Sequence, residues 1–224
     1  MINNKVKILL VDDHAVLREG LKTVLELDGN FVIAGEADNG YDACELVPKV
    51  NPDIVLMDIR MKKMDGIEAA KNIKRSFPET KILLLTMHDD ENYIMDALEI
   101  GVEGYILKMS EMEKVIHAIK VIHENDTYFD PKISRSIAKR SSDLRDHHKR
   151  EKYLDTLGLT SREIEVVDCI VNGLSSRQIA EKLFISTNTV YNHRRNIFSK
   201  LKINRASDLV RIAINKGLFL SNKD

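Results

Sequence analysis

Four short apolar runs of this chain end in polar side chains that could together handle a phosphoryl group. These side chains are Asp12 and Asp13, Asp58, Thr86 and Lys108. Three neighbouring carboxylates repel one another, and a hard divalent cation such as Mg²⁺ relieves the repulsion because it prefers carboxylate and water oxygens. Thr86 adds a hydroxyl donor and Lys108 a flexible positive charge. Acids, hydroxyl and ammonium in one place would suit a phosphoryl group beside Mg²⁺.

The apolar runs have the character of strands in a buried parallel sheet. They are short and rich in Val, Ile and Leu, and they alternate with longer segments that have helical spacing, which predicts five βα units. The strands are expected at 7–11, 31–34, 54–57, 82–85 and 104–107, and the helices at 15–27, 40–50, 65–76, 92–101 and 111–123. Two strand orders are common in such sheets, and the flavodoxin-like order makes strands one and three neighbours. That order brings Asp12, Asp13 and Asp58 into one crevice.

At these positions the sequence resembles the receiver domain of two-component response regulators, from residue 5 to about residue 124. The resemblance extends to Asp65-Gly66 after the third strand and to the run 104–108 at the fifth. It implies that Asp58 accepts a phosphoryl group from a sensor histidine kinase. It also implies that Mg²⁺ is held by Asp12, Asp13, Asp58 and the backbone carbonyl of Arg60.

The same resemblance assigns roles to three further residues. Lys108 would pair with the phosphoryl oxygens, and Thr86 would hydrogen-bond one of them and move inward. Tyr105 would then change rotamer, so that Thr86 and Tyr105 form a switch. The electrostatics agree, because a carboxylate attacking a phosphohistidine needs the charge of its target neutralised. The chain is therefore expected to be a switch rather than a metabolic enzyme, supporting phosphoryl transfer only to its own Asp58 and slow autodephosphorylation.

Three positions depart from the common receiver pattern. Lys62 stands where many receivers have Pro, Met87 where many have a small residue, and Met109 where many have Pro. Because Lys62 and Met87 flank the acceptor, an alternative remains open. In it the chain is an atypical response regulator that binds DNA or a partner without receiver phosphorylation.

Two classes of enzyme do not fit the sequence. An aspartate-nucleophile phosphohydrolase has a second Asp two residues after its nucleophile, where this chain has Arg60. A dinucleotide-dependent enzyme needs a glycine-rich turn after the first strand, where this chain has Asp12 and Asp13.

The charge of the chain changes along its length. Residues 1–127 hold 15 basic and 24 acidic side chains, residues 128–154 hold 8 and 4, and residues 155–224 hold 11 and 7. We interpret these as an acidic receiver, a basic linker with a short helix opened by Pro131, and a second domain. The basic second domain is the part expected to meet a polyanion.

Residues 155–224 contain the start and stop signals of four short helices. Thr160 to Glu163 and Ser175 to Gln178 are capping boxes, and Gly173 marks the end of the first helix. A third helix is expected at about 187–201 and a last one at about 205–216. The spacing of the second and third suits a helix-turn-helix.

One face of the third helix is polar and suited to DNA. It carries Asn188, Tyr191, Asn192, Arg195 and Ser199, of which Arg can pair with guanine and Asn with adenine. Backbone phosphates are expected to be bound by Thr187, Thr189, Arg194, Lys200 and Lys202.

The motifs of this second domain resemble the LuxR-type DNA-binding domain, and the whole chain is similar to NarL/FixJ-type response regulators. They are Leu159–Glu163, Gly173–Ser175, Gln178–Ala180, and Thr189-Val190 with His193. The resemblance places Tyr191, Asn192 and Arg195 at the positions that contact bases. It implies homodimer binding to paired half-sites of double-stranded DNA, with Val210 and Ile214 on the helix that pairs across the dimer.

The composition is that of a soluble globular protein. Hydrophobic residues make up 43% and charged residues 31% of the chain, which excludes collagenous and wholly disordered classes. The longest apolar stretches are strand-sized, far below the roughly 20 residues of a membrane span. No segment resembles a signal peptide, so the sequence predicts a cytoplasmic regulator of transcription.

Overall fold

The computed structural model describes residues 5–87, 91–133 and 156–215. Contacts divide the chain into two compact units, residues 1–125 and 126–224. This division falls two residues before the boundary predicted from the sequence. Most of the predicted linker, from residue 134 onward, lies outside the described residues, and so does the continuation of the predicted short helix.

The first unit is a parallel sheet covered by helices on both faces, as predicted. Its strands are β1 (Val6–Val11), β2 (Phe31–Ala37), β3 (Ile54–Asp58), β4 (Lys81–Thr86) and β5 (Gly104–Leu107). Its helices are α1 (Ala15–Asp28), α2 (Gly40–Val50), α3 (Gly66–Ser76), α4 (Glu91–Ile100) and α5 (Met112–His123). The strand order β2-β1-β3-β4-β5 is flavodoxin-like, since β1 and β3 are neighbours.

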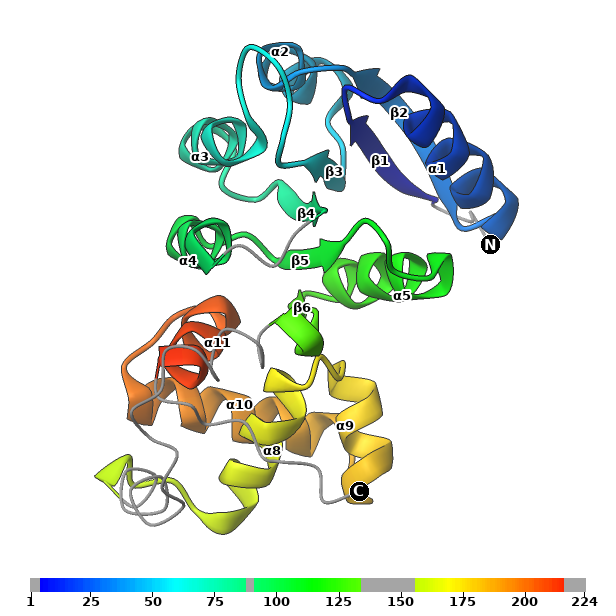
Figure 1. The fold of residues 1–224 in the computed structure, drawn as a ribbon. Coiled ribbons are helices and arrows are strands. Elements are labelled where there is room, and N and C mark those ends of the chain that lie inside the picture. The colour runs from blue at the N-terminus through cyan, green and yellow to red at the C-terminus, as the bar shows by residue number, and fades with distance from the viewer. Residues whose placement is uncertain (1–4, 88–90, 134–155, 216–224) are drawn as a thin grey trace. The chain divides into compact units, whose positions relative to one another are not determined.

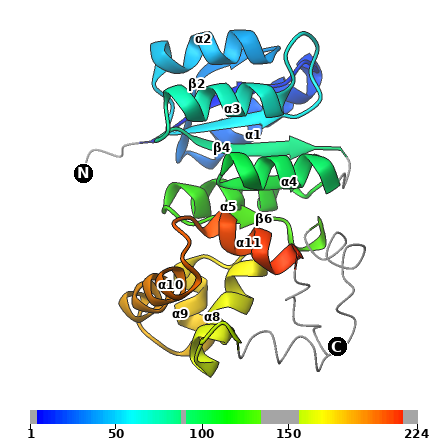
Figure 2. The ribbon, with the colours of Figure 1, turned by 90° about the vertical axis from the view of Figure 1, so that its left-hand side faces the viewer.

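The two faces of this sheet are covered by different helices. Figure 1 shows α1 and α5 on one face and α2, α3 and α4 on the other, and Figure 2 is seen from the side of α3 and α4. The strands β1, β3 and β4 are almost wholly buried, because helices cover both sides of a parallel sheet. Their side chains Ile8, Leu56 and Leu83 are at most 1% exposed.

The register of the strands brings the predicted polar residues to one edge. Val11 lies beside Met57, and the next residues along these two neighbouring strands are Asp12 and Asp58. On the other side of β3, Asp58 lies beside Leu85, and Thr86 lies beside Leu107 on β5. The carboxyl ends of four strands therefore meet where the sequence predicts a crevice.

The second unit is a small helical domain. Its helices are α8 (Ser161–Val171), α9 (Ser176–Leu183), α10 (Thr187–Leu201) and α11 (Ala206–Asn215). The unit also holds β6 (Tyr128–Phe129), which stands after β5 in the strand order and makes the sheet six-stranded rather than five-stranded as predicted. Two residues are too short a run to be recognised by alternation in a sequence.

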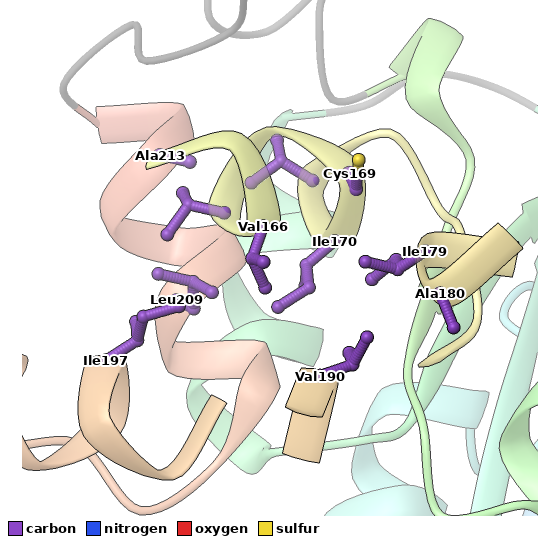
Figure 3. Close-up of a cluster of buried hydrophobic side chains, with 11 residues drawn as sticks. Val166, Cys169, Ile170, Ile179, Ala180, Val190, Ile197, Leu209 and Ala213 are labelled. Carbon is purple, nitrogen blue, oxygen red and sulfur yellow. The ribbon is translucent and has the colours of Figure 1, made fainter. Parts of the chain in front are cut away.

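The core of the helical domain is a cluster of side chains contributed by all four helices. Figure 3 shows α8 contributing Val166 and Ile170, α10 contributing Val190, and α11 contributing Leu209. These four side chains are at most 3% exposed. Because each short helix has only one apolar stripe, none of them could bury it without the other three.

Both predicted capping boxes are present. The Thr160 hydroxyl accepts a hydrogen bond from the Glu163 backbone N–H, and the Glu163 carboxylate accepts one from the Thr160 N–H. Ser175 and Gln178 do the same at α9. These bonds satisfy amide groups that have no partner inside the helix, and so they fix where α8 and α9 begin.

Candidate functional site

The ammonium group of Lys108 lies between two buried carboxylates at the edge of the first sheet. Its Nζ is 2.6 Å from Asp58 Oδ2 and 2.7 Å from Asp12 Oδ2. All three side chains are at most 3% exposed. A single buried positive charge is thus shared by two buried negative charges.

Asp58 has the environment of a shielded nucleophile. Burial raises its pKa above the ordinary value, while the hydrogen bond and charge of Lys108 act in the opposite direction. Its second oxygen, Oδ1, accepts a hydrogen bond of 3.3 Å from the Arg60 N–H. The side chain is 2% exposed, so it is shielded from water.

The loop after β3 holds Asp58 through a close backbone approach at Gly66. The Gly66 N–H donates a hydrogen bond of 2.8 Å to the carbonyl of Ile59. A Cβ atom at Gly66 would lie 2.1 Å from the Asp58 carbonyl oxygen. Glycine is therefore required here by space, and Asp65 before it caps α3 by accepting a hydrogen bond from the Glu68 N–H.

The carboxylates form a donor set suited to a hard divalent cation. Asp12, Asp13, His14 and Asp58 each offer one ligand atom, and these atoms all lie within 4.8 Å of one another. Three of the four donors are carboxylate oxygens, which fits Mg²⁺. The fourth, His14, was not predicted as a site residue, although its position directly after the two aspartates was a signal.

His14 is bonded to the predicted metal ligands. Its Nδ1 lies 2.9 Å from Asp13 Oδ1 and 3.2 Å from Asp12 Oδ1, and its backbone N–H donates to Asp12 Oδ1 at 2.9 Å. Arg18 holds the same loop by donating a hydrogen bond of 2.5 Å to the Asp12 carbonyl. These contacts tie Asp12 and Asp13 to the start of α1, beside Asp58.

The two predicted switch residues are both buried. Thr86, the last residue of β4, is 4% exposed, and its carbonyl accepts a hydrogen bond of 2.7 Å from the Lys108 N–H. Tyr105 on β5 is fully buried. Their movement on phosphorylation stays a prediction, as does a metal contact of the Arg60 carbonyl.

In the second unit, α10 presents the predicted polar face to solvent. Asn188, Tyr191, Asn192 and Arg195 are all exposed, Tyr191 to 49%. Arg195 donates a hydrogen bond of 3.3 Å to the Asn192 side-chain oxygen, so the two side chains lie side by side. The face is open and rich in groups able to bond base edges.

Two of the predicted phosphate-binding residues are paired within the unit. Arg194 is 8% exposed, and its Nη1 lies 2.5 Å from Asp126 Oδ1. Lys200 lies 2.6 Å from Glu163 Oε2. Lys202 is exposed, while Thr187 and Thr189 are half-buried in the first turn of α10, where the Ser186 hydroxyl accepts a hydrogen bond from the Thr189 N–H.

The predicted dimer residues on α11 are buried in the single chain. Val210 is 1% exposed and Ile214 is fully buried. Pairing of two chains through this helix would require both side chains to become exposed, and it stays a prediction.

Comparisons with known proteins agree with both halves of this description. Residues 8–120 match the response regulator receiver domain, and residues 157–213 match the bacterial regulatory proteins of the luxR family. The transcriptional regulatory protein DegU of Brevibacillus brevis is 37% identical, over 96% of this chain and 95% of its own. The chain belongs to the NarL/FixJ-type response regulators. The oxygen regulatory protein NreC of Staphylococcus carnosus, another response regulator, is 36% identical over 95% of this chain and 99% of its own.

One similar solved structure covers almost the whole of this chain. ChrA, the response regulator of a heme-sensing two-component system, is 30% identical with a TM-score of 0.53, over 96% of this chain and 99% of that chain. The predicted combination of a receiver with a LuxR-type DNA-binding domain is therefore confirmed. The match to the luxR family of regulatory proteins and the likeness to DegU, a transcriptional regulatory protein, make this response regulator a regulator of transcription. Within its described residues, none of the helices combines the length and apolar character that crossing a membrane requires.

Proposed function

We propose that phosphorylation of Asp58 by a sensor histidine kinase switches the C-terminal unit to bind paired half-sites of DNA as a homodimer. The observation that carries the proposal is the position of Asp58, which is buried, 2.6 Å from Lys108 Nζ and within a cluster of carboxylates. We place this reaction in the cytoplasm.

The reaction joins Asp58 to the phosphohistidine of the kinase, beside Lys108. An oxygen of Asp58 attacks the phosphorus of a phosphohistidine, the P–N bond breaks as the P–O bond forms, and the released imidazole nitrogen takes up a proton. The product is an acyl phosphate. Lys108, already at hydrogen-bond distance from Asp58, pairs with an oxygen of the transferred group, which stabilises its charge.

A divalent cation completes the charge balance. Asp12, Asp13, Asp58 and the carbonyl of Arg60 would hold Mg²⁺, which supplies positive charge to the transferring group. His14 helps to hold Asp12 by its hydrogen bonds, and its ring lies close to the Asp13 carboxylate. Slow hydrolysis of the acyl phosphate, limited by the burial of Asp58, returns the switch to its starting state.

The signal leaves the site through β4 and β5. Lys108 turns from Asp12 to a phosphoryl oxygen, and its backbone N–H is hydrogen-bonded to the carbonyl of Thr86, so the two residues are joined beside the site. Thr86 moves toward the phosphoryl group, and Tyr105 changes rotamer to fill the space. A local change of charge is thus converted into a change of surface.

DNA is bound through the exposed face of α10. Tyr191, Asn192 and Arg195 contact base edges in the major groove, and Asn188 lies one turn before them. Thr187, Thr189 and Lys202 contact phosphates, which position the helix without specifying sequence. Val210 and Ile214 pair the two copies once they are released from burial.

The acceptor is tested by intact mass spectrometry after incubation with Mg²⁺ and acetyl phosphate. The wild type is expected to gain a single phosphoryl adduct, and Asp58→Asn none. Asp65→Asn is the matched control, because it removes a neighbouring carboxylate while asparagine still caps α3, and it is expected to be phosphorylated normally. An adduct of unchanged yield on Asp58→Asn would overturn the assignment.

A chain that gains no adduct is tested next with a phosphorylated histidine kinase, since the half-exposed Met87 borders the site and can hinder a small donor. No transfer from either donor, with DNA binding intact, would favour the phosphorylation-independent regulator.

A further inference from the structure

A buried ionic cluster in the C-terminal unit joins the start of that unit to α10. The carboxylate of Asp126 accepts hydrogen bonds from the Ser176 N–H at 2.7 Å and from the Ser176 hydroxyl at 3.1 Å. Its Oδ1 also lies 2.5 Å from Arg194 Nη1. The three residues are between 1% and 8% exposed.

The groups around Asp126 constitute an anion-binding site. Ser176 is the first residue of α9, and the N–H groups of a first helical turn have no partner within the helix. They point along the positive end of the helix dipole, where anions bind. The guanidinium of Arg194 converges on the same carboxylate from a second helix, and it also donates to the Ser176 hydroxyl at 3.4 Å.

The location of this site favours a phosphate of DNA as its external ligand. Arg194 is buried, but it directly precedes Arg195 and follows Tyr191 by three residues, and these two are exposed on the face of α10 that is proposed to enter the major groove. In a helix-turn-helix the helix before the recognition helix crosses the DNA backbone, and here that helix is α9. A phosphodiester and a carboxylate offer the same kind of oxygen acceptors to Ser176 and Arg194.

We infer that Asp126 acts as an internal substitute for a DNA phosphate and competes with DNA for Ser176 and Arg194. The inference rests on the proposed DNA-binding function and adds a regulatory residue to it. While Asp126 occupies the site, α9 and α10 lack one backbone contact. When Asp126 releases Ser176 and Arg194, these two residues are free to bind a phosphate of the duplex.

The position of Asp126 in the chain connects this competition to the receiver. α5 ends at His123, so only two residues separate the last receiver helix from Asp126. The next residues are also held in the C-terminal unit, where Tyr128 and Phe129 are buried beside Gly173. Any rearrangement of α5 therefore acts directly on the segment that carries the competing carboxylate.

The test uses the full-length protein and a labelled duplex of random sequence, about 30 base pairs or three helical turns long, at low salt. Such a probe reports phosphate contacts, which are independent of sequence. Asp126→Asn is expected to bind about ten-fold more tightly than the wild type without phosphodonor, since the loss of one charge-assisted contact is of that size. Its stimulation by phosphorylation shrinks by the same factor.

Asp130→Asn is the matched control. It removes the same charge from the same buried segment, but Asp130 accepts a hydrogen bond from the Lys132 N–H and not from Arg194. Its affinity is expected to stay within about two-fold of the wild type. An equal gain in both variants would mean that net charge, and not competition, controls binding.

A second variant separates competition from a structural role. Adding Arg194→Leu to Asp126→Asn is expected to remove the gain in affinity, because the arginine that receives the phosphate is gone. Circular dichroism and urea unfolding check that each variant is folded. If Asp126→Asn is folded and binds no more tightly than the wild type, the cluster is only structural and the inference fails.

Hydrogen exchange of the wild type gives an independent readout. Saturating duplex is expected to accelerate exchange of the peptide 126–133 while it protects α10. Unchanged exchange of this segment in the complex would also overturn the inference. A wild type that fails to bind duplex under any condition would instead overturn the proposed function.

Discussion

Lys108 Nζ lies 2.6 Å from Asp58 Oδ2 and is shared with Asp12 at 2.7 Å. One buried ammonium between two buried carboxylates leaves an excess of negative charge, to which Asp13 adds at the rim. Buried charges are tolerated when they are paired, and a divalent cation can supply the pairing that Lys108 leaves incomplete. The stability of the receiver and its affinity for metal should therefore be linked.

The first prediction concerns this linkage. Lys108→Ala is expected to lower the free energy of unfolding by about 3 kcal/mol in EDTA, because two buried carboxylates lose their counter-charge. Added Mg²⁺ should restore more stability to the variant than to the wild type, since binding to the native state stabilises by mass action. Urea unfolding with and without Mg²⁺ measures both effects.

The control for Lys108 is Lys49→Ala, which removes an exposed partner of Glu45. Its effect is expected to be below about 1 kcal/mol. Equal stabilisation of wild type and Lys108→Ala by Mg²⁺ would show that Lys108 does not compensate the carboxylates that bind the metal.

The second prediction concerns the loop that positions Asp58. Gly66→Ala would place a Cβ atom 2.1 Å from the Asp58 carbonyl oxygen, so the backbone of the acceptor must move. We expect a loss of stability of at least about 3 kcal/mol, at the upper end of overpacking effects, together with slower phosphorylation by acetyl phosphate.

Gly20→Ala tests whether the loss of stability is specific to Gly66 and not common to any Gly→Ala substitution. Gly20 lies inside α1, and a Cβ there would meet no atom within 4 Å. Alanine in a helix interior is favoured over glycine by roughly 0.5–1 kcal/mol, so this variant should be slightly more stable. A Gly66→Ala protein as stable and as readily phosphorylated as wild type would refute the steric argument.

The sequence predicted the receiver site because parallel strands share a carboxyl edge. Asp12, Asp58 and Thr86 each follow an apolar run, and strand order then fixes their proximity without any knowledge of side-chain contacts. His14 was missed because its role depends on the direction of one imidazole. Its place after Asp13 was visible, but its hydrogen bonds were not.

At Arg194 the helical spacing and the residue type led to different predictions. It follows Val190 by four positions and precedes Ile197 by three, so its spacing places it on the buried face of α10. Its charge suggested solvent or DNA instead. The partner that makes burial possible, Asp126, lies 68 positions earlier in the chain, and no local pattern can indicate a pairing at that distance.

The third prediction separates base contacts from phosphate contacts on α10. Arg195→Ala is expected to relax base preference in a binding-site selection and to cost about 1–3 kcal/mol on the preferred site. Lys202→Asn should weaken binding to all sequences alike and reduce the salt slope of the affinity by about one. Asparagine is chosen because Lys202 has a φ of 54°, a conformation that it adopts more readily than alanine. Parallel loss of preference in both variants would contradict this division.

The fourth prediction is a pH dependence at the capping box of α8. Glu163 accepts hydrogen bonds from Thr160 and lies 2.6 Å from Lys200. Burial acts to raise the pKa of Glu163, but the bonds from Lys200 and Thr160 outweigh it and hold the pKa below its ordinary value. A carboxyl with a lowered folded pKa stabilises the protein above its unfolded pKa, and this contribution is lost as pH falls through the folded value.

Glu163→Gln keeps the capping hydrogen bonds but removes the charge. Relative to wild type it should unfold about 1 kcal/mol more easily at pH 7, a typical value for a charge-assisted hydrogen bond. The difference should shrink as pH falls below the ordinary pKa of glutamate and disappear only below the lowered folded pKa, where Glu163 is neutral in both states. Glu165→Gln, at an exposed pair with Arg162, should differ little from wild type throughout. Urea unfolding from pH 7 to pH 3 measures both variants, and a difference for Glu163→Gln that stays constant over this range would show that its charge contributes nothing.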